Sequence, residues 1–401
     1  MTSITAIVPT YNRAAYLRDA LTSLQAQTRP IDEIIVWDDG STDGTEAAVR
    51  ELGFDIRYFR APNGGKSRAL NAALEKAGGD YVWICDDDDL ALPHAAETLA
   101  GMLDGDPSLG AAGAGYLKFR DDPATGARQQ ESPGYWPDLS RGTAIRHLLE
   151  DIFLFQNATM TRRAVHDRAG PFREDLARSI DYDMIVRLGL CAPIRVIDAP
   201  VFLQRKHDGD RGPAAARHAA ARSEEVWKET DRRIFSELRD HISLGFYESM
   251  FDADDAALAR RAALLQRACV YARRTDWPAA LADMAAATEA CPGVQLSTEE
   301  QQICRRAVAG KHGIDEMLQP DTRRRIIDLG RRNPVAAELA REMALGLKWR
   351  IREAMNNGRP ARALSVGRMI LALGAAGGTR RGAVAPARIA ERQDLPDAAY
   401  P

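Results

Sequence analysis

The sequence predicts an α/β domain with a mostly parallel sheet, followed by an all-α domain. Over roughly the first 120 residues, short apolar runs alternate with amphipathic helical stretches. Strands separated by helices of this length form right-handed crossovers and parallel pairs. After residue 212 the chain becomes rich in Ala, Arg and Glu, with almost no strand pattern. We therefore expect an α/β domain over 1–212, a helical domain over 213–376 and a disordered tail over 377–401.

Hydrophobic periodicity places the elements of the α/β domain in order. The predicted strands cover residues 4–8, 33–37, 56–59 and 81–85. The first strand is followed by a helix with an apolar face, and a Ser or Thr within 40–45 is expected to cap the second helix. A third helix precedes the last strand, and residues 121–132 are expected to form a polar loop. The apolar faces of the first and third helices consist of Leu17, Ala20, Leu21, Leu24, and of Leu70, Ala73, Leu74, Ala77.

Composition narrows the class of protein. The formal net charge of −3 gives no electrostatic case for binding nucleic acid or an anionic membrane surface. Five scattered cysteines fit neither a zinc site nor a disulfide framework, which favours a reducing compartment. The amino terminus lacks the pattern of a signal peptide, and no apolar run approaches the ~20 residues of a membrane span. A cytoplasmic protein without a transmembrane segment is expected.

The helical domain contains a stretch that resembles half of a tetratricopeptide repeat. Between residues 275 and 292 an aromatic residue, Ala and Leu positions and a closing Pro fall at that motif's spacing. A weaker version runs over residues 357–364. Two imperfect units favour an ordinary helical bundle over a repeat array. We expect this domain to bind a protein partner or to form a homo-oligomer.

Four consecutive carboxylates end the predicted strand over 81–85: Asp86, Asp87, Asp88 and Asp89. This places the charge at the carboxyl edge of the sheet, where open α/β folds bind ligands. Crowded carboxylates repel one another, so a cation should neutralise them. A hard divalent ion, held together with a substrate's phosphates, fits this pattern best. A solvated acidic loop is the alternative.

Three further loops follow the other predicted strands, over residues 9–13, 38–44 and 63–68. In a parallel sheet all four loops share one edge and converge on one crevice. Their chemistry suits a nucleoside diphosphate: Tyr11 can lie against a base and Asp39 can accept a base or ribose proton. Gly64 and Gly65 allow close approach of the backbone, and Arg68 offers a forked donor to phosphate. Each loop alone is ordinary turn chemistry, but four in register indicate a site.

The segments 7–13, 36–45 and 86–89 together resemble the family 2 inverting glycosyltransferases, over about residues 3–210. The resemblance implies a GT-A fold, which is Rossmann-like, and a nucleotide-activated sugar used with Mn²⁺ or Mg²⁺. It implies that Asp88 binds the metal together with Asp86. It also implies that Asp86 or Asp87 faces the ribose, and that Asp89 supports the metal ligands without binding the metal directly. The implied nucleotide-sugar site comprises Pro9, Tyr11, Asn12, Arg13, Asp39, Gly65, Arg68, Asp86 and Asp87.

Two downstream segments extend the resemblance. Residues 170–175 resemble the family's Gly-Gly-Phe turn, and 181–187 its Glu-Asp-x-Asp-Leu-x-x-Arg segment, with Ile180 where Glu is usual. Asp181 matches the family's catalytic base; a helix N-cap, which Ser179 could equally provide, is the alternative. His207 belongs to a segment similar to the closing basic-x-His element. The resemblance implies that it completes the metal or diphosphate site, although a lone His after a strand is more often on the surface.

The expected reaction moves a sugar from a nucleoside-diphosphate sugar, with a UDP-sugar favoured, to a hydroxyl group. The acceptor is a glycan, a lipid-linked glycan or a protein, which suggests polysaccharide biosynthesis. Loops between about residues 110 and 180, including Tyr135 and Trp136, are expected to read donor sugar and acceptor. A sugar-phosphate nucleotidyltransferase is disfavoured because the first loop lacks glycine. A non-catalytic sugar-nucleotide or glycan-binding module is the other alternative, disfavoured by the presence of Asp39, Asp88 and Asp181 together.

Overall fold

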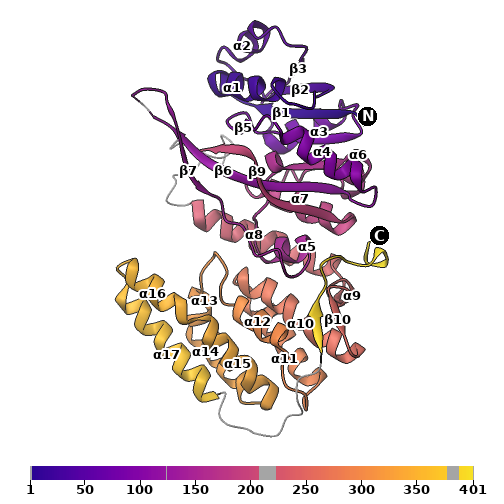
Figure 1. The fold of residues 1–401 in the computed structure, drawn as a ribbon. Helices are drawn as coiled ribbons and strands as arrows, with labels where there is room; N and C mark the ends of the chain where they lie inside the picture. Colours follow the sequence, from indigo (N-terminus) through magenta and orange to yellow (C-terminus); the bar gives the residue numbers. More distant parts are fainter. Residues whose placement is uncertain (1, 123, 207–222, 377–387, 401) are drawn as a thin grey trace. The chain divides into compact units, whose positions relative to one another are not determined.

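The computed structural model describes residues 2–122, 124–206, 223–376 and 388–400. The chain forms two compact units (Figure 1). The first contains residues 1–138 and 152–227 with the last two residues, and the second contains residues 139–151 and 228–399. The short segment 139–151 therefore belongs to the second unit although the first unit surrounds it in the sequence. The predicted division at residue 212 does not include this excursion.

The first unit is built on one nine-stranded sheet in the order β3-β2-β1-β4-β8-β6-β9-β5, with β7 paired to β6. The strands are β1 Ile4–Thr10, β2 Glu33–Asp38, β3 Arg57–Arg60, β4 Tyr81–Ile84, β5 Leu90–Ala91, β6 Ala111–Asp121, β7 Arg128–Pro133, β8 Thr159–Arg162 and β9 Ile194–Arg205. From β3 to β4 every pair is parallel, and beyond β4 the sheet becomes mixed. The α/β fold class is confirmed. The predicted polar loop over 121–132 is wrong in part, because it contains most of β7.

The first unit contains the three helices that were predicted between its first four strands, and further helical elements after them. They are α1 Ala14–Gln25, α2 Thr45–Glu51, α3 Lys66–Leu74, α4 Ala95–Gly105, the 3₁₀ helix η1 Gln156–Ala158, α6 Arg163–Ala169 and α7 Ile180–Cys191. The predicted cap of α2 is wrong: Gly44 is the N-cap, and the carboxylate of Asp43 accepts from the Thr45 N–H at 3.1 Å. Asp competes well with Ser and Thr for such a position because its oxygen is also a strong acceptor.

One core cluster ties α7 to the parallel part of the sheet. Ile7, Ile35 and Ile84 of the sheet and Leu70 of α3 share it with side chains of α6 and α7. The members from α6 and α7, or from the turn between them, are Val165, Phe172, Met184 and Leu188. Burying such side chains contributes roughly 1.5–3 kcal/mol each. The start of α7 is thereby held beside the carboxyl edge of the sheet.

The second unit is mostly helical. Its elements are α5 Ala144–Glu150, most of α8 Ser223–His241, α9 Leu244–Glu248, β10 Phe251–Ala253, α10 Ala256–Arg273, α11 Trp277–Ala290, α12 Thr298–Arg306, α13 Asp315–Leu318, α14 Pro320–Gly330, α15 Pro334–Gly346, α16 Lys348–Asn356, α17 Pro360–Ala376, β11 Ile389–Glu391 and the 3₁₀ helix η4 Asp397–Ala399. Both stretches with a tetratricopeptide pattern fall at helix–turn–helix junctions, α10–α11 and α16–α17. The repeat assignment stays a prediction.

The predicted disordered tail is wrong for its last part. β11 pairs antiparallel with β10, so that Phe251 lies opposite Glu391. Ile389 is buried, and the carboxylate of Glu391 accepts from Arg146 and Arg306 at 3.0 and 2.8 Å. One apolar anchor and two ion pairs therefore order this segment despite its polar composition. Residues 377–387 lie outside the described part of the chain. Within the described residues, no helix has the length and apolar character needed to cross a membrane.

Candidate active site

The first two predicted site loops are joined by Asn12. Its backbone N–H donates to Ser41 Oγ at 2.9 Å, and its Oδ1 accepts from the Thr42 N–H at 2.7 Å. Asn12 has a positive φ of 53°, a left-handed conformation that Asn tolerates better than most residues. The loop after β1 is thus fixed against the loop after β2, and Tyr11 in the first of these loops is half-buried.

Asp39 joins the second loop to the third. Its Oδ1 accepts from the Gly64 N–H and its Oδ2 from the Gly65 N–H, both at 2.8 Å. Gly65 has φ 90° and ψ 158°, a region that essentially only glycine occupies. The side chain of Asp39 is buried and has both oxygens engaged, each with a further lone pair. Asp39 therefore shapes the glycine turn that leads into α3 and Arg68, whose side chain is exposed.

The acidic loop after β4 is neutralised in part by cations of the protein. Arg13 Nη1 lies 3.1 Å from Asp87 Oδ1 and 2.5 Å from Asp88 Oδ2. Lys66 forms an ion pair with Asp86, and Thr10 donates its hydroxyl to Asp87 at 2.7 Å. Burial raises the pKa of Asp87 to about 6, and repulsion from its acidic neighbours adds to this against the attraction of Arg13. Two basic side chains from neighbouring loops thus offset part of this negative charge, and the expected divalent ion stays a prediction.

Asp181 lies in the first turn of α7. The N-cap of this helix is Ser179, in a left-handed conformation with φ 56°, and Asp181 is the second helical residue. Asp181 is therefore not the cap. Burial raises the pKa of Asp181, the charge of Lys66 lowers it and that of Asp86 raises it. These two influences place the Asp181 carboxylate within electrostatic reach of the acidic loop.

The other acidic residues near Asp181 have structural partners. Asp183 is buried, and its Oδ2 accepts from Arg187 Nε at 2.9 Å and Nη2 at 2.7 Å. Arg187 also donates to backbone oxygens of the turn before α7, including Pro171 O at 3.0 Å. Asn71 of α3 holds the same turn through Phe172, accepting from its N–H at 2.7 Å and donating to its O at 2.9 Å. The ion pair and these hydrogen bonds fix the start of α7, the helix that carries Asp181.

Comparison with known proteins places part of the chain in a family. Residues 5–170 match the model of "Glycosyl transferase family 2", and these residues carry the four loops described above. These residues, less than half of the chain, form a glycosyl transferase family 2 domain.

An uncharacterised glycosyltransferase of Rickettsia conorii is 28% identical over 213 residues, which are 53% of this chain and 35% of that protein. A GalNAc(5)-diNAcBac-PP-undecaprenol β-1,3-glucosyltransferase of Campylobacter jejuni is 41% identical over 108 residues, which are 25% of this chain and 34% of that protein. The chain thus spans about a third of the length of both relatives. A crystal structure of S. aureus TarS 1–349 in complex with UDP-GlcNAc has 19% identity and a TM-score of 0.52, covering 89% of this chain and 92% of that one. This likeness supports the GT-A fold.

A group of three carboxylates in this family 2 domain has the chemistry of a divalent-cation site. Asp86, Asp88 and Asp89 each offer an oxygen, and these oxygens lie within 4.8 Å of one another. Carboxylate oxygens are the donors that Mg²⁺ and Mn²⁺ prefer. The predicted pair Asp86 and Asp88 is therefore brought together, with Asp89 as a neighbour. His207 lies outside the described residues.

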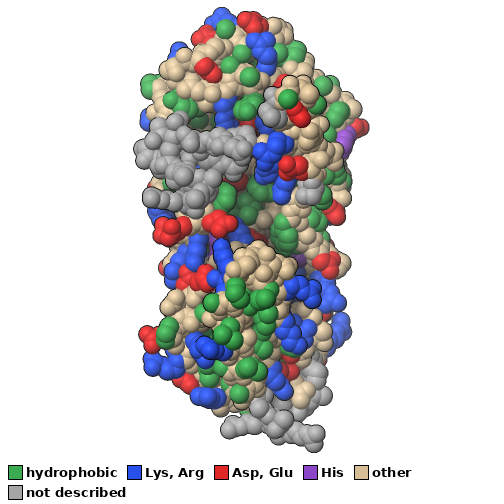
Figure 2. Space-filling model, turned by 90° about the vertical axis from the view of Figure 1, so that its left-hand side faces the viewer, with side chains coloured by type: hydrophobic (Ala, Val, Ile, Leu, Met, Phe, Trp, Pro, Cys, Tyr) green, Lys and Arg blue, Asp and Glu red, His purple; other side chains and the backbone are tan. Residues whose placement is uncertain are grey.

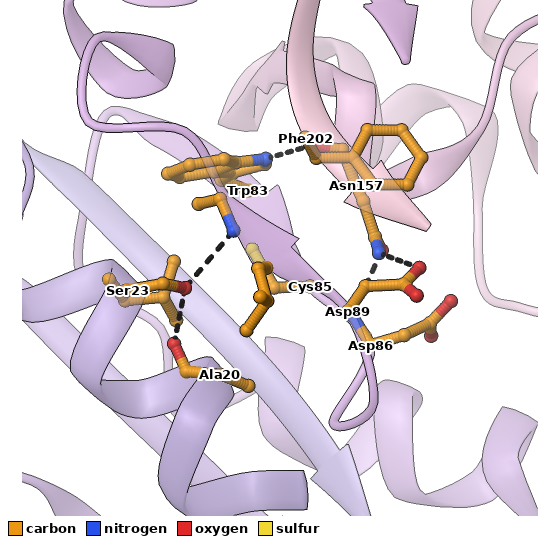
Figure 3. A pocket seen from close by; sticks show the side chains of 11 residues that line it. Ala20, Ser23, Trp83, Cys85, Asp86, Asp89, Asn157 and Phe202 are labelled. Carbon is orange, nitrogen blue, oxygen red and sulfur yellow. Dashed lines mark hydrogen bonds between the residues drawn. The ribbon is translucent and has the colours of Figure 1, made fainter. Parts of the chain in front are cut away.

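Two organising residues of the site were not assigned a role by the sequence analysis. Asn157 of η1 donates to Asp89 Oδ2 at 2.6 Å and accepts from the Asp86 N–H at 2.9 Å, as Figure 3 shows from the pocket behind the loop. Arg205, at the end of β9, donates its N–H to Asp89 Oδ1 and its Nε–H to Asp88 O, both at 2.8 Å. The basic-x-His resemblance contained Arg205, but no local pattern marks Asn157, which is placed by the antiparallel pairing of β8 with β4.

The remaining predicted residues are Pro9, Tyr135 and Trp136. Pro9 is in β1 opposite Trp37, next to the first loop. Trp136 packs edge-on against Phe153 with ring centroids 5.2 Å apart, whereas Tyr135 is largely exposed. Of this aromatic pair, Tyr135 is thus the one whose side chain is accessible to solvent.

Proposed function

We propose that this protein transfers a sugar from a nucleoside-diphosphate sugar to an acceptor hydroxyl by a single displacement with inversion, with Asp181 as the base. The observation that carries the proposal is the position of Asp181, in the first turn of α7 and within electrostatic reach of Asp86 and Lys66. A base on this helix can face the acceptor hydroxyl while the leaving diphosphate lies at the loops.

The donor is bound by the loops after the parallel strands. Tyr11 and the backbone beside Pro9 line the place for the base. Asp39 contributes through its remaining lone pairs and through the turn at Gly64 and Gly65 that it holds. Arg68, which is exposed at the start of α3, provides a forked donor for the diphosphate. Asn12 and Arg13 hold the first loop in place.

Asp88 and Asp86, with Asp89 beside them, would hold the divalent cation. When bound, Mn²⁺ or Mg²⁺ neutralises the charge that builds on the departing diphosphate, so that no proton donor is needed there. Lys66 and Arg13 are charged side chains at the same place and can turn toward phosphate oxygens once the carboxylates are neutralised.

Transfer at the anomeric carbon is a single displacement. The acceptor oxygen forms a bond to the anomeric carbon, the bond from that carbon to the phosphate oxygen breaks, and the hydroxyl proton passes to Asp181. A free Asp is a weak base with a pKa of ~3.9. Burial raises the pKa of Asp181, which makes it a stronger base. Positioned general bases typically contribute ~10²–10⁴-fold.

The acceptor is a glycan, a lipid-linked glycan or a protein, and a UDP-sugar is the favoured donor. The TarS structure of similar fold contains UDP-GlcNAc, which makes this donor the first to test. The experiment is to incubate the full chain with UDP-sugars and Mn²⁺ and to measure release of UDP, with excess EDTA as the control. We expect UDP release that EDTA abolishes. A non-catalytic module would bind the donor and release no nucleotide, and a nucleotidyltransferase would act only on a sugar phosphate and a nucleoside triphosphate.

A further inference from the structure

Large exposed apolar side chains are concentrated in one part of the second unit. Six such side chains are exposed among the described residues, and five of them lie between residues 345 and 371. They are Leu345, Trp349, Met355, Leu364 and Leu371. Leu364 and Leu371 are 57% and 75% exposed. Single exposed apolar residues are ordinary, but such a concentration marks an interaction surface.

Leu345 lies in α15, and the other four residues lie on exposed faces of α16 and α17. Along α17, Leu364, Arg368 and Leu371 follow one another at helical spacing and are exposed, while the opposite side buries Val366, Met369 and Leu373. Along α16, Lys348, Arg352 and Met355 form a similar exposed row. α16 and α17 pack against each other. Figure 2 shows the side of the second unit on which they lie, with apolar side chains set among Lys and Arg. We call the exposed residues Lys348, Trp349, Arg352, Met355, Leu364, Arg368 and Leu371 the α16–α17 face.

The charge of this region is opposite to that of the whole chain. Residues 320–376 contain twelve Lys and Arg and five Asp and Glu, whereas the whole chain has a net charge of −3. Positive charge is therefore concentrated in the helices α14 to α17. The net charge of the chain does not reveal this, because acidic residues elsewhere offset it. The guanidinium of Arg350 also lies 4.0 Å from the centre of the Trp349 ring, so the indole is exposed on one side and stacked on a cation on the other.

We propose that the α16–α17 face binds the surface of an anionic lipid bilayer. Trp and Leu interleaved with Lys and Arg are the composition of interfacial helices, whose apolar side enters the boundary between headgroups and acyl chains. The basic side chains add attraction to anionic headgroups. A soluble polyanion would use the basic residues but would leave Met355, Leu364 and Leu371 without a role. The proposal departs from the expectation based on net charge, because the net charge averages over the whole chain and the basic residues are concentrated in residues 320–376. The binding is independent of the proposed sugar transfer.

The test is sedimentation of the full chain with two kinds of vesicles, pure phosphatidylcholine and equimolar phosphatidylcholine and phosphatidylglycerol. We expect binding to the anionic vesicles that weakens with added salt, since exposed charges are screened. The double variant Leu364→Ser/Leu371→Ser should lower the partition coefficient at least ~10-fold, the effect of keeping one such side chain out of the acyl region. Arg368→Gln should lower it about fivefold. Arg50→Gln, at an exposed position of α2 in the first unit, is the matched control for Arg368→Gln and should bind as the wild type does.

Three outcomes would overturn the proposal. The first is equal sedimentation with both kinds of vesicles. The second is binding that Arg368→Gln weakens but the leucine substitutions do not, together with equal binding to soluble polyphosphate, which would show a polyanion site. The third is a wild-type dimer in solution that the leucine variant converts to a monomer, without vesicle binding, which would show an interface between copies. UDP release is measured on the same preparations. A preparation that releases UDP but does not bind vesicles contradicts the membrane proposal alone, and one that binds vesicles but releases no UDP contradicts the proposed catalysis alone.

Discussion

Arg13 Nη1 lies 2.5 Å from Asp88 Oδ2. Asp88, the carboxylate that we propose as the direct metal ligand, is therefore already paired with the guanidinium of Arg13 from the loop after β1. Because a divalent ion carries more charge than a guanidinium, an ion that enters must displace Arg13 or share Asp88 with it. Removing Asp88 should then cost ion binding and leave most of the structure unchanged.

Asp88→Asn should abolish Mn²⁺-dependent turnover and the thermal stabilisation by Mn²⁺. An ion that binds only the folded state stabilises it by ~2.7 kcal/mol at 100 times its Kd, and the amide removes a charged ligand. The melting temperature without metal should stay close to the wild-type value, because Arg13 keeps its pair with Asp87. Asp55→Asn, an exposed carboxylate elsewhere in the unit, is the control. Full turnover of the wild type in excess EDTA would contradict the metal dependence.

Asp39→Ala should weaken binding of nucleoside diphosphates by about tenfold or more. The substitution removes the acceptor for the Gly64 and Gly65 N–H groups as well as the carboxylate beside the base, and an unsatisfied donor costs ~1–3 kcal/mol. Asp39→Asn keeps one acceptor oxygen and should lose less. The measurement is calorimetry with UDP. Unchanged affinity in both variants would show that Asp39 has been misassigned.

His166 should make the first unit less stable in acid. Its ring is buried against Phe172 with Nε2 unpaired, and burial lowers its pKa from 6.5 to about 4. Because the unfolded chain takes up the proton first, stability is lost as the pH falls from 6.5 toward 4, by up to about 3 kcal/mol. His166→Phe should flatten this part of the pH dependence in urea denaturation, whereas His94→Phe, at an exposed position, should not. An unchanged slope in His166→Phe would refute the assignment.

Deleting residues 228–401 should give an insoluble protein. The segment 139–151 packs within the second unit, where Leu148 and Leu149 are fully buried. Arg273 and Arg274 donate to backbone oxygens of Glu150 at its end, and the buried Glu150 carboxylate pairs with Arg306 at 3.0 Å. Truncation would expose the two leucines to water and would remove the basic partner of the Glu150 carboxylate. A soluble fragment with a sharp unfolding transition would contradict the prediction. Deleting only 388–401 removes β11 and η4 and should have a milder effect.

The sequence predicts what depends on local pattern. The strands β1 to β4, the buried face of α1 and the four loops follow from periodicity, from Gly and Asn at turns, and from charge at strand ends. Asp181 was identified as the base through a family resemblance, which adds information that the local pattern lacks.

What escaped prediction depends on contacts distant in the sequence. Asn157 and Arg205 reach the acidic loop only because β8 and β9 join the sheet beside it. The pairing of β11 with β10 joins residues more than 130 positions apart, and the transfer of 139–151 to the second unit depends on partners such as Arg273 and Arg306. No periodicity within these segments encodes their partners.

The most direct test of the account is the rate of sugar transfer by Asp181→Asn, measured beside donor affinity. The amide preserves the size of the side chain but cannot take the hydroxyl proton, and the helix keeps Ser179 as its N-cap. The fold and the affinity for UDP should therefore survive, and residual UDP release should depend on metal as in the wild type. We expect transfer to fall by at least ~10²-fold. Transfer at the wild-type rate would show that Asp181 is not the base and would contradict the proposed mechanism.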